Sequence, residues 1–188
     1  MEWNSSANDF VEALASSNPT PGGGAAAAMA GAMGCALALM AASTTLRQKL
    51  ASQQQGLLTE SIKQLQTLKE ALKTLIQKDA KAYDSYIAAR KLPKENPNRQ
   101  NILQDALWFA ATVPVDTATT AVHCLHEIDK IKDSIAPVIV SDVLCAQHLL
   151  QSAIRCAVEN IRANIAYITN EERKEMLEKQ IITLLKSC

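Results

Sequence analysis

An aspartate stands in the apolar stripe of a predicted helix, at a position where the pattern calls for leucine. Leucines recur every seven residues at Leu58, Leu65 and Leu72, and the next member of this series is Asp79. A phenol, Tyr83, lies four residues further on the same side. Burial raises the pKa of a carboxyl group, and a carboxyl with a raised pKa can donate a proton during catalysis. The pattern favours a functional acid at Asp79, and a solvated carboxylate on a drifting stripe is the alternative.

A turn of prolines and glycines is the second feature that can bind a ligand. The segment Pro21-Gly22-Gly23-Gly24 precedes a run from Ala25 to Ala42 that lacks charged or strongly polar side chains. A helix that begins at such a turn has backbone N–H groups without partners. These groups suit the carbonyl or carboxylate of a ligand. The sequence therefore predicts a ligand contact at this turn.

Polar side chains also interrupt an apolar stretch nearer the C-terminus. Asp142, Asn160 and Asn164 fall on one side of a predicted helix, and the two asparagines are neighbours at i, i+4. Asparagine amides can hydrogen-bond the edge of a heterocycle or satisfy each other. The spacing is equally compatible with a ligand contact and with a polar rim between subunits.

A basic cluster of Arg90, Lys91 and Lys94 can receive the carboxylates of a ligand, although exposed basic residues are usually solvated.

The net charge of zero argues against a nucleic-acid partner. Five cysteines without a CxxC pair, and three histidines without a zinc spacing, predict no metal site and reduced thiols. No basic segment precedes the apolar run, so we expect a cytoplasmic protein.

The elements that must position these residues are all predicted to be helices, because no strand-like alternation occurs at useful length. We expect one domain over residues 1–188, an all-α bundle with two long apolar helices at its centre. The chain is short for enclosing both, which favours a homodimer. Pro114 is expected to break or kink its helix. The expected helices are Asn8–Ser16, Gly22–Leu50, Gln53–Lys91, Asn98–Val113, Pro114–Lys132, Pro137–Ile168 and Glu171–Lys186.

The apolar run is long enough to raise the alternative of a membrane-spanning helix. Its residues are mostly alanine and glycine, which drive insertion far less than leucine, isoleucine or phenylalanine. No aromatic residues flank it. A helix that is apolar on all sides must be buried on all sides, so we expect a central bundle helix and no membrane partner.

Four blocks of the sequence, in order, resemble the cyclodeaminase/cyclohydrolase family. The family comprises the C-terminal domain of formiminotransferase-cyclodeaminase and the stand-alone methenyltetrahydrofolate cyclohydrolases. The resemblance spans nearly the whole chain and implies an all-α fold, a dimer, a folate site near the glycine turn and no metal or redox cofactor. The blocks are Ser17–Gly24, Asp79-Ala80-Lys81-Ala82-Tyr83, Leu92-Pro93-Lys94 and Val113-Pro114.

The resemblance also implies roles for individual residues. Asp79 matches the catalytic acid of the family, and Pro21 to Gly24 match its glycine turn. Asp142, Asn160 and Asn164 resemble its later polar positions. The implied reactions are hydrolysis of 5,10-methenyltetrahydrofolate to formyltetrahydrofolate, and closure of formiminotetrahydrofolate to methenyltetrahydrofolate with release of ammonia.

One segment departs from the family pattern. The family usually carries a glycine, two basic residues and an aromatic residue after the apolar helix, whereas this chain has Leu46-Arg47-Gln48-Lys49-Leu50. The glycine and the aromatic residue are absent. This departure leaves open an alternative function, that of an inactive folate-binding or helical assembly protein with the same fold.

Overall fold

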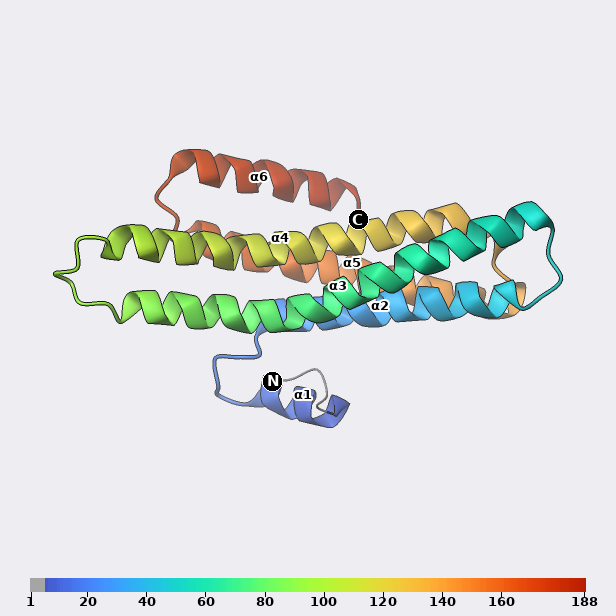
Figure 1. Ribbon diagram of the computed structural model, residues 1–188, viewed down its shortest axis with the longest axis horizontal. Coiled ribbons are helices and arrows are strands. Elements are labelled where there is room, and N and C mark those ends of the chain that lie inside the picture. The colour runs from blue at the N-terminus through green and yellow to red at the C-terminus, as the bar shows by residue number, and fades with distance from the viewer. Residues whose placement is uncertain (1–5) are drawn as a thin grey trace.

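The computed structural model describes residues 6–188 as a bundle of long helices (Figure 1). No strand occurs in that range, so the predicted all-α fold is confirmed. Two 3-10 turns, Lys132–Ser134 and Pro137–Ile139, connect the fourth and fifth helices. The six α-helices are α1 (Ala7–Ala15), α2 (Gly23–Leu46), α3 (Ser52–Arg90), α4 (Arg99–Ile131), α5 (Val140–Ile165) and α6 (Glu171–Lys186).

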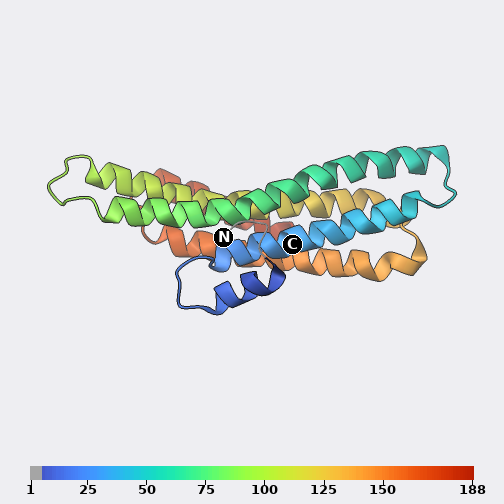
Figure 2. The ribbon, with the colours of Figure 1, turned by 60° about the horizontal axis from the view of Figure 1, so that its bottom comes forward.

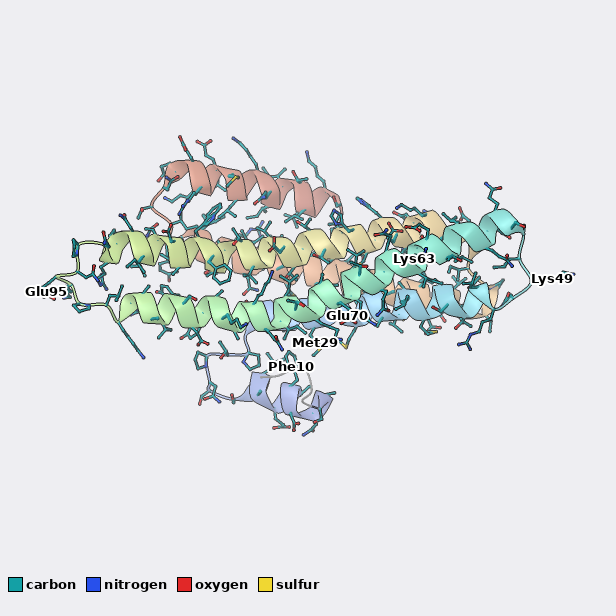
Figure 3. All side chains as sticks on the ribbon, in the orientation of Figure 1. Phe10, Met29, Lys49, Lys63, Glu70 and Glu95 are labelled. Atoms are coloured by element: carbon teal, nitrogen blue, oxygen red, sulfur yellow. The ribbon has the colours of Figure 1, made fainter. Side chains whose placement is uncertain are left out.

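Four of these helices, α2 to α5, form the body of the bundle, and each packs against its neighbours along much of its length. Helix α6 lies on the outside of the bundle against α4 and α5, and α1 lies on the opposite side (Figures 1 and 2). Phe10 is the only buried residue of α1 and turns toward the bundle near Met29 (Figure 3). The four long helices therefore hold the core.

The predicted leucine seam of α3 is confirmed, because Leu58, Leu65 and Leu72 are all fully buried. Helix α2 faces this seam with small residues and is buried along most of its length. At Gly34 a side chain would meet the Ala146 carbonyl oxygen of α5 at 2.9 Å, closer than real Cβ atoms approach. Glycine is therefore required at this position for the close packing of α2 against α5.

Two segments, α2 and residues 137–165, are long and apolar enough to cross a bilayer by length and composition. A core helix of a bundle meets the same criterion. Helix α2 contacts α3, α4 and α5, as expected for a central helix. Neither helix is buried on all sides, however: α2 is exposed at Met33 and Met40, and α5 at Val140 and Leu144. The expectation of burial on all sides is therefore wrong for α2 within one chain.

The predicted break at Pro114 is wrong. Helix α4 runs without interruption from Arg99 to Ile131 with Pro114 inside it. Proline lacks the N–H that would bond the carbonyl four residues earlier, which here belongs to Ala110. The Asn164 Nδ2 of α5 donates to this carbonyl oxygen at 3.0 Å. A tertiary hydrogen bond thus replaces the missing helical one, and α4 continues.

The ends of the other elements differ little from expectation. Helix α2 ends at Leu46 rather than Leu50, and α5 begins at Val140, after a 3-10 turn that starts at the predicted Pro137. Asn170 caps α6, because its side-chain oxygen accepts the Arg173 N–H at 2.9 Å. Asn98 precedes α4, but its side chain makes no capping hydrogen bond.

Candidate functional site

The start of α2 lies beside the middle of the bundle rather than at its end. Ala25, in the first turn of α2, contacts Asp79, and α3 continues beyond that point to Arg90. Helices α4 and α5 also pass the start of α2, so the space that a longer α2 would fill is open. A cleft of about 370 Å³ occupies this space. Its lining residues are Pro19, Thr20, Gly22, Gly23, Gly24, Asp79, Ala82, Tyr83, Tyr86, Leu107, Ala110, Asn160, Asn164 and Tyr167.

Asp79 is the only carboxylic acid among the residues that line the cleft. The Ala25 N–H donates a hydrogen bond of 2.9 Å to Asp79 Oδ2. Asp79 therefore caps the start of α2 from another helix, where the positive end of the helix dipole favours a carboxylate. The side chain makes no ion pair within the described part of the chain.

Two opposing effects act on the Asp79 carboxyl group. Burial disfavours the charged form and raises its pKa, and the hydrogen bond from Ala25 lowers the pKa by a smaller amount. The net result is a pKa above the ordinary value for aspartate. Asp79 is thus a carboxyl group that holds its proton to higher pH than a solvated one, inside a cleft that a ligand can enter.

The glycine turn, residues Pro21 to Gly24, differs from expectation at the N–H group of Ala25, which directly follows it. The sequence predicts unpaired N–H groups that bind a ligand, but the Ala25 N–H binds Asp79. A Cβ atom at Gly24 would overlap Asp79 Oδ1. Gly24 is therefore needed for the carboxylate to approach the backbone. The N–H groups of Gly23 and Gly24 make no hydrogen bond within the described residues, and they remain available to a ligand.

The two asparagines of α5 lie in one wall of the cleft. Asn160 Nδ2 donates to the Cys156 carbonyl oxygen at 2.8 Å. A side chain at Gly23 would contact the Asn160 amide, so the glycine turn and α5 face each other closely. Asn164 Nδ2 donates both to the Ala110 carbonyl oxygen and to the Asn160 carbonyl oxygen.

Aromatic residues form another part of the wall. Tyr83 and Tyr86 come from α3, and Tyr167 follows α5. The Arg90 guanidinium lies over the Tyr86 ring at 5.6 Å from its centroid, which places one member of the basic cluster beside a residue that lines the cleft. A flat heterocycle can stack on such rings.

Gln104 of α4 holds Tyr167 in place. Its Nε2 donates to the Tyr167 carbonyl oxygen at 3.2 Å, and its Oε1 accepts the Thr169 N–H at 2.8 Å. The sequence alone does not identify Gln104, because a polar residue on an amphipathic helix does not indicate a contact with a residue more than sixty positions away. It also missed Leu107 and Ala110, whose types suggest only packing.

Three residues predicted for the site do not line the cleft. Asp142 is in the first turn of α5, about 27 Å from Asn160 at 1.5 Å per residue along the helix axis. Asp142 lies on the same face of α5 as the asparagines but far from them along the helix axis. Lys94 is exposed in the loop between α3 and α4, and Pro21 is the only residue between Pro19 and Gly24 that is not in the lining. The cleft itself is formed without these three residues.

The raised pKa of Asp79 predicts how stability depends on pH. Between the ordinary pKa and the raised one, the folded protein binds more protons than the unfolded chain, so stability falls as pH rises through this window. Asp79→Asn stays neutral and keeps an oxygen for the Ala25 N–H. We therefore expect the variant to melt at a higher temperature than the wild type at neutral pH.

This difference in melting temperature should shrink as the pH falls below the Asp79 pKa, where the wild-type carboxyl is also neutral. Thermal melts of both proteins by circular dichroism, across a pH series, measure it. A difference that is constant over the whole series would contradict the raised pKa.

The structure is an all-α domain with a four-helix body, in which the half-buried Asp79 caps the start of a helix rich in small residues. Formiminotetrahydrofolate cyclodeaminase from Thermotoga maritima has this fold, with a TM-score of 0.90 over 98% of this chain and 90% of that chain, at 27% identity. A sequence model of the family described as formiminotransferase-cyclodeaminase matches residues 6–183. The chain belongs to this family.

The matches with two curated relatives cover different shares of those proteins. Methenyltetrahydrofolate cyclohydrolase from Methylorubrum extorquens is 30% identical in an alignment that covers 95% of this chain and 89% of that protein. Formimidoyltransferase-cyclodeaminase from Sus scrofa is 28% identical over 95% of this chain, but the match covers only 34% of that longer protein. The similarity thus extends along most of the first relative and along about a third of the second.

Proposed function

We propose that this protein is a tetrahydrofolate one-carbon enzyme that hydrolyses 5,10-methenyltetrahydrofolate to formyltetrahydrofolate. The observation that carries the proposal is the Asp79 carboxyl group, which has a raised pKa and lies in a cleft at the start of α2. The Methylorubrum extorquens relative, of which the match covers 89%, is named a methenyltetrahydrofolate cyclohydrolase. Closure of formiminotetrahydrofolate with release of ammonia is the second candidate, because the structural relative is named a cyclodeaminase.

The hydrolysis needs one group that can take and return a proton. Water adds to the methenyl carbon that bridges two folate nitrogens, and Asp79 accepts a proton from this water. One C–N bond then breaks, and the departing nitrogen receives the proton from Asp79. The hydroxyl group left on the carbon loses its remaining proton to solvent and becomes the formyl oxygen, so that the positive charge of the methenyl group leaves as a proton. General acid–base catalysis of this kind contributes roughly 10²–10⁴-fold. In the second reaction, the same carboxyl would protonate the departing ammonia.

The remaining cleft residues suit the binding of a pterin. Tyr83, Tyr86 and Tyr167 offer ring faces, and the Gly23 and Gly24 N–H groups suit a carbonyl oxygen. The proposed reaction requires no metal and no redox cofactor, since each step moves only a proton and a C–N or C–O bond. We propose a folate as the small-molecule substrate, no nucleic acid and no membrane as partner, and the cytoplasm as the place of action.

The departure from the family pattern lies far from this chemistry. Arg47 to Leu50 follow α2 at the end opposite to the cleft, and Lys49 marks that end of the bundle (Figure 3). The 24 residues of α2 span about 36 Å. The changed segment therefore removes no residue from the cleft, which favours an active enzyme over an inactive binding protein.

Assays of both reactions with one purified sample test the proposal. We expect methenyltetrahydrofolate to be consumed faster than in buffer alone, or formiminotetrahydrofolate to release ammonia. Acceleration of only the second reaction would make the protein a cyclodeaminase. Folate binding without acceleration of either reaction would establish the alternative of an inactive binding protein.

We also propose that the protein is a homodimer. The exposed faces of α2 and α5 carry apolar side chains, including Met33, Met40 and Leu144, and apolar surface of this kind marks contact sites between proteins. We expect light scattering at micromolar concentration to give the mass of two chains. The substitution Met40→Glu should lower the measured mass toward that of a single chain. A wild-type protein that is monomeric in this measurement would contradict the proposal.

A further inference from the structure

Pro114 and Asn164 form a structural unit between α4 and α5. Because proline has no N–H, the Ala110 carbonyl oxygen loses its helical donor. Asn164 Nδ2 donates to this oxygen at 3.0 Å and to the Asn160 carbonyl oxygen at 2.9 Å. An α4 with any other residue at position 114 would have its own donor for Ala110. The proline thus creates the acceptor that the asparagine binds.

The two hydrogen bonds fix the orientation of the Asn164 amide. A primary amide has two N–H donors, and both are used here on backbone carbonyl groups. The amide therefore cannot flip without placing its oxygen against two carbonyl oxygens. Asn164 Oδ1 has no donor within the described residues, where every fully buried polar side-chain atom has a partner. Oδ1 is consequently an accessible acceptor in the wall of the cleft.

We propose that Pro114 is a positioning residue that acts through Asn164, so that Asn164 Oδ1 accepts a hydrogen bond from an N–H group of the substrate heterocycle. The substrate class follows from the geometry, since an oxygen with no freedom to become a donor selects a ligand edge that carries N–H groups. The identity of that heterocycle as a pterin rests on the proposed function, whereas the coupling of Pro114 to Asn164 does not.

Pro114→Ala tests this role directly. The variant restores an N–H at position 114, which draws the Ala110 carbonyl back toward the helix and away from Asn164. We expect the dissociation constant for tetrahydrofolate, measured by calorimetry, and the KM to rise about tenfold, with a smaller change in kcat. The melting temperature should not fall, because proline is the least favourable residue inside a helix. A purely structural role for Pro114 would change stability and leave affinity unaltered.

A double-mutant cycle identifies the partner through which Pro114 acts. Asn164→Ala alone should weaken binding at least as much as Pro114→Ala. In the Asn164→Ala background, Pro114→Ala should cause no further loss of affinity. Asp116→Ala, on the exposed side of the same turn, is the matched control and should bind like the wild type. Additive losses in the cycle, or wild-type affinity in either single variant, would overturn the proposal.

A measurement without substrate separates this inference from the proposed function. In protein labelled with ¹⁵N-asparagine, the side-chain amide signals of Asn164 are identified by their loss in Asn164→Ala. We expect Pro114→Ala to shift these signals and to speed their hydrogen exchange. Unchanged signals would overturn the coupling. If the wild type binds no folate while the signals respond as expected, the pterin is wrong and the coupling stands.

Discussion

Replacement of Asp79 by asparagine is expected to reduce turnover of methenyltetrahydrofolate, or of formiminotetrahydrofolate, by about two orders of magnitude or more. Asparagine keeps the shape of the side chain and an oxygen for the Ala25 N–H, which donates to Asp79 Oδ2 in the wild type. It cannot take or return a proton. Substrate affinity should therefore stay within a few fold, so that the loss appears in kcat.

The control for this experiment is Asp84→Asn. Asp84 is on the same helix and is exposed, so the substitution removes an equal charge at a site without contact to the cleft. Its kinetic constants should match those of the wild type. A rate near that of the wild type in Asp79→Asn would disprove the catalytic role, and a purely structural Asp79 would instead let Asp79→Leu stabilise the helix seam with activity intact.

The expected loss is large because the cleft offers few substitutes for Asp79. Its lining contains no histidine, lysine, cysteine or glutamate, and its other ionisable groups are the phenols of Tyr83, Tyr86 and Tyr167. Asp79 is thus the group best suited to exchange a proton with water and with a folate nitrogen.

Much of this arrangement can be predicted from periodicity alone. A leucine every seven residues places Asp79 on the buried stripe of α3, and the structure finds Leu58, Leu65 and Leu72 fully buried on that stripe. The uninterrupted apolar run from Ala25 to Ala42 predicts a central helix. The asparagines at i, i+4 predict a shared polar face, and both line the cleft. In each case the signal is local to one helix.

The parts that could not be predicted depend on how helices lie against one another. A helical period shows that Asp142 shares a face with Asn160, but not that the cleft lies at only one of them, about 27 Å along α5 from the other. Pro114 signals a break when α4 is considered alone, because the donor that replaces its N–H comes from Asn164 on α5. The Ala25 N–H is likewise unpaired until α3 places Asp79 beside it.

The contact between Asp79 and the glycine turn leads to the second large prediction, for Gly24→Ala. The added methyl group would overlap Asp79 Oδ1, so the carboxylate must turn away from the start of α2 and lose its hydrogen bond with Ala25. A displacement of about 1 Å in a catalytic group can cost about 10²-fold in rate. We expect a loss of that order in kcat/KM from a single methyl group outside the acid itself.

The fold should tolerate this change, because alanine is a better helix former than glycine and the displaced carboxylate can rotate into the open cleft. Gly56→Ala is the matched control: Gly56 lies in α3 with nothing within 4 Å of an added Cβ atom, so this variant should keep full activity and gain about 0.5–1 kcal/mol in stability. Kinetics and thermal melts of both variants measure the outcome. Wild-type kcat/KM in Gly24→Ala would mean that catalysis does not require the carboxylate at the start of α2, and the placement of Asp79 against that helix would then serve the fold alone.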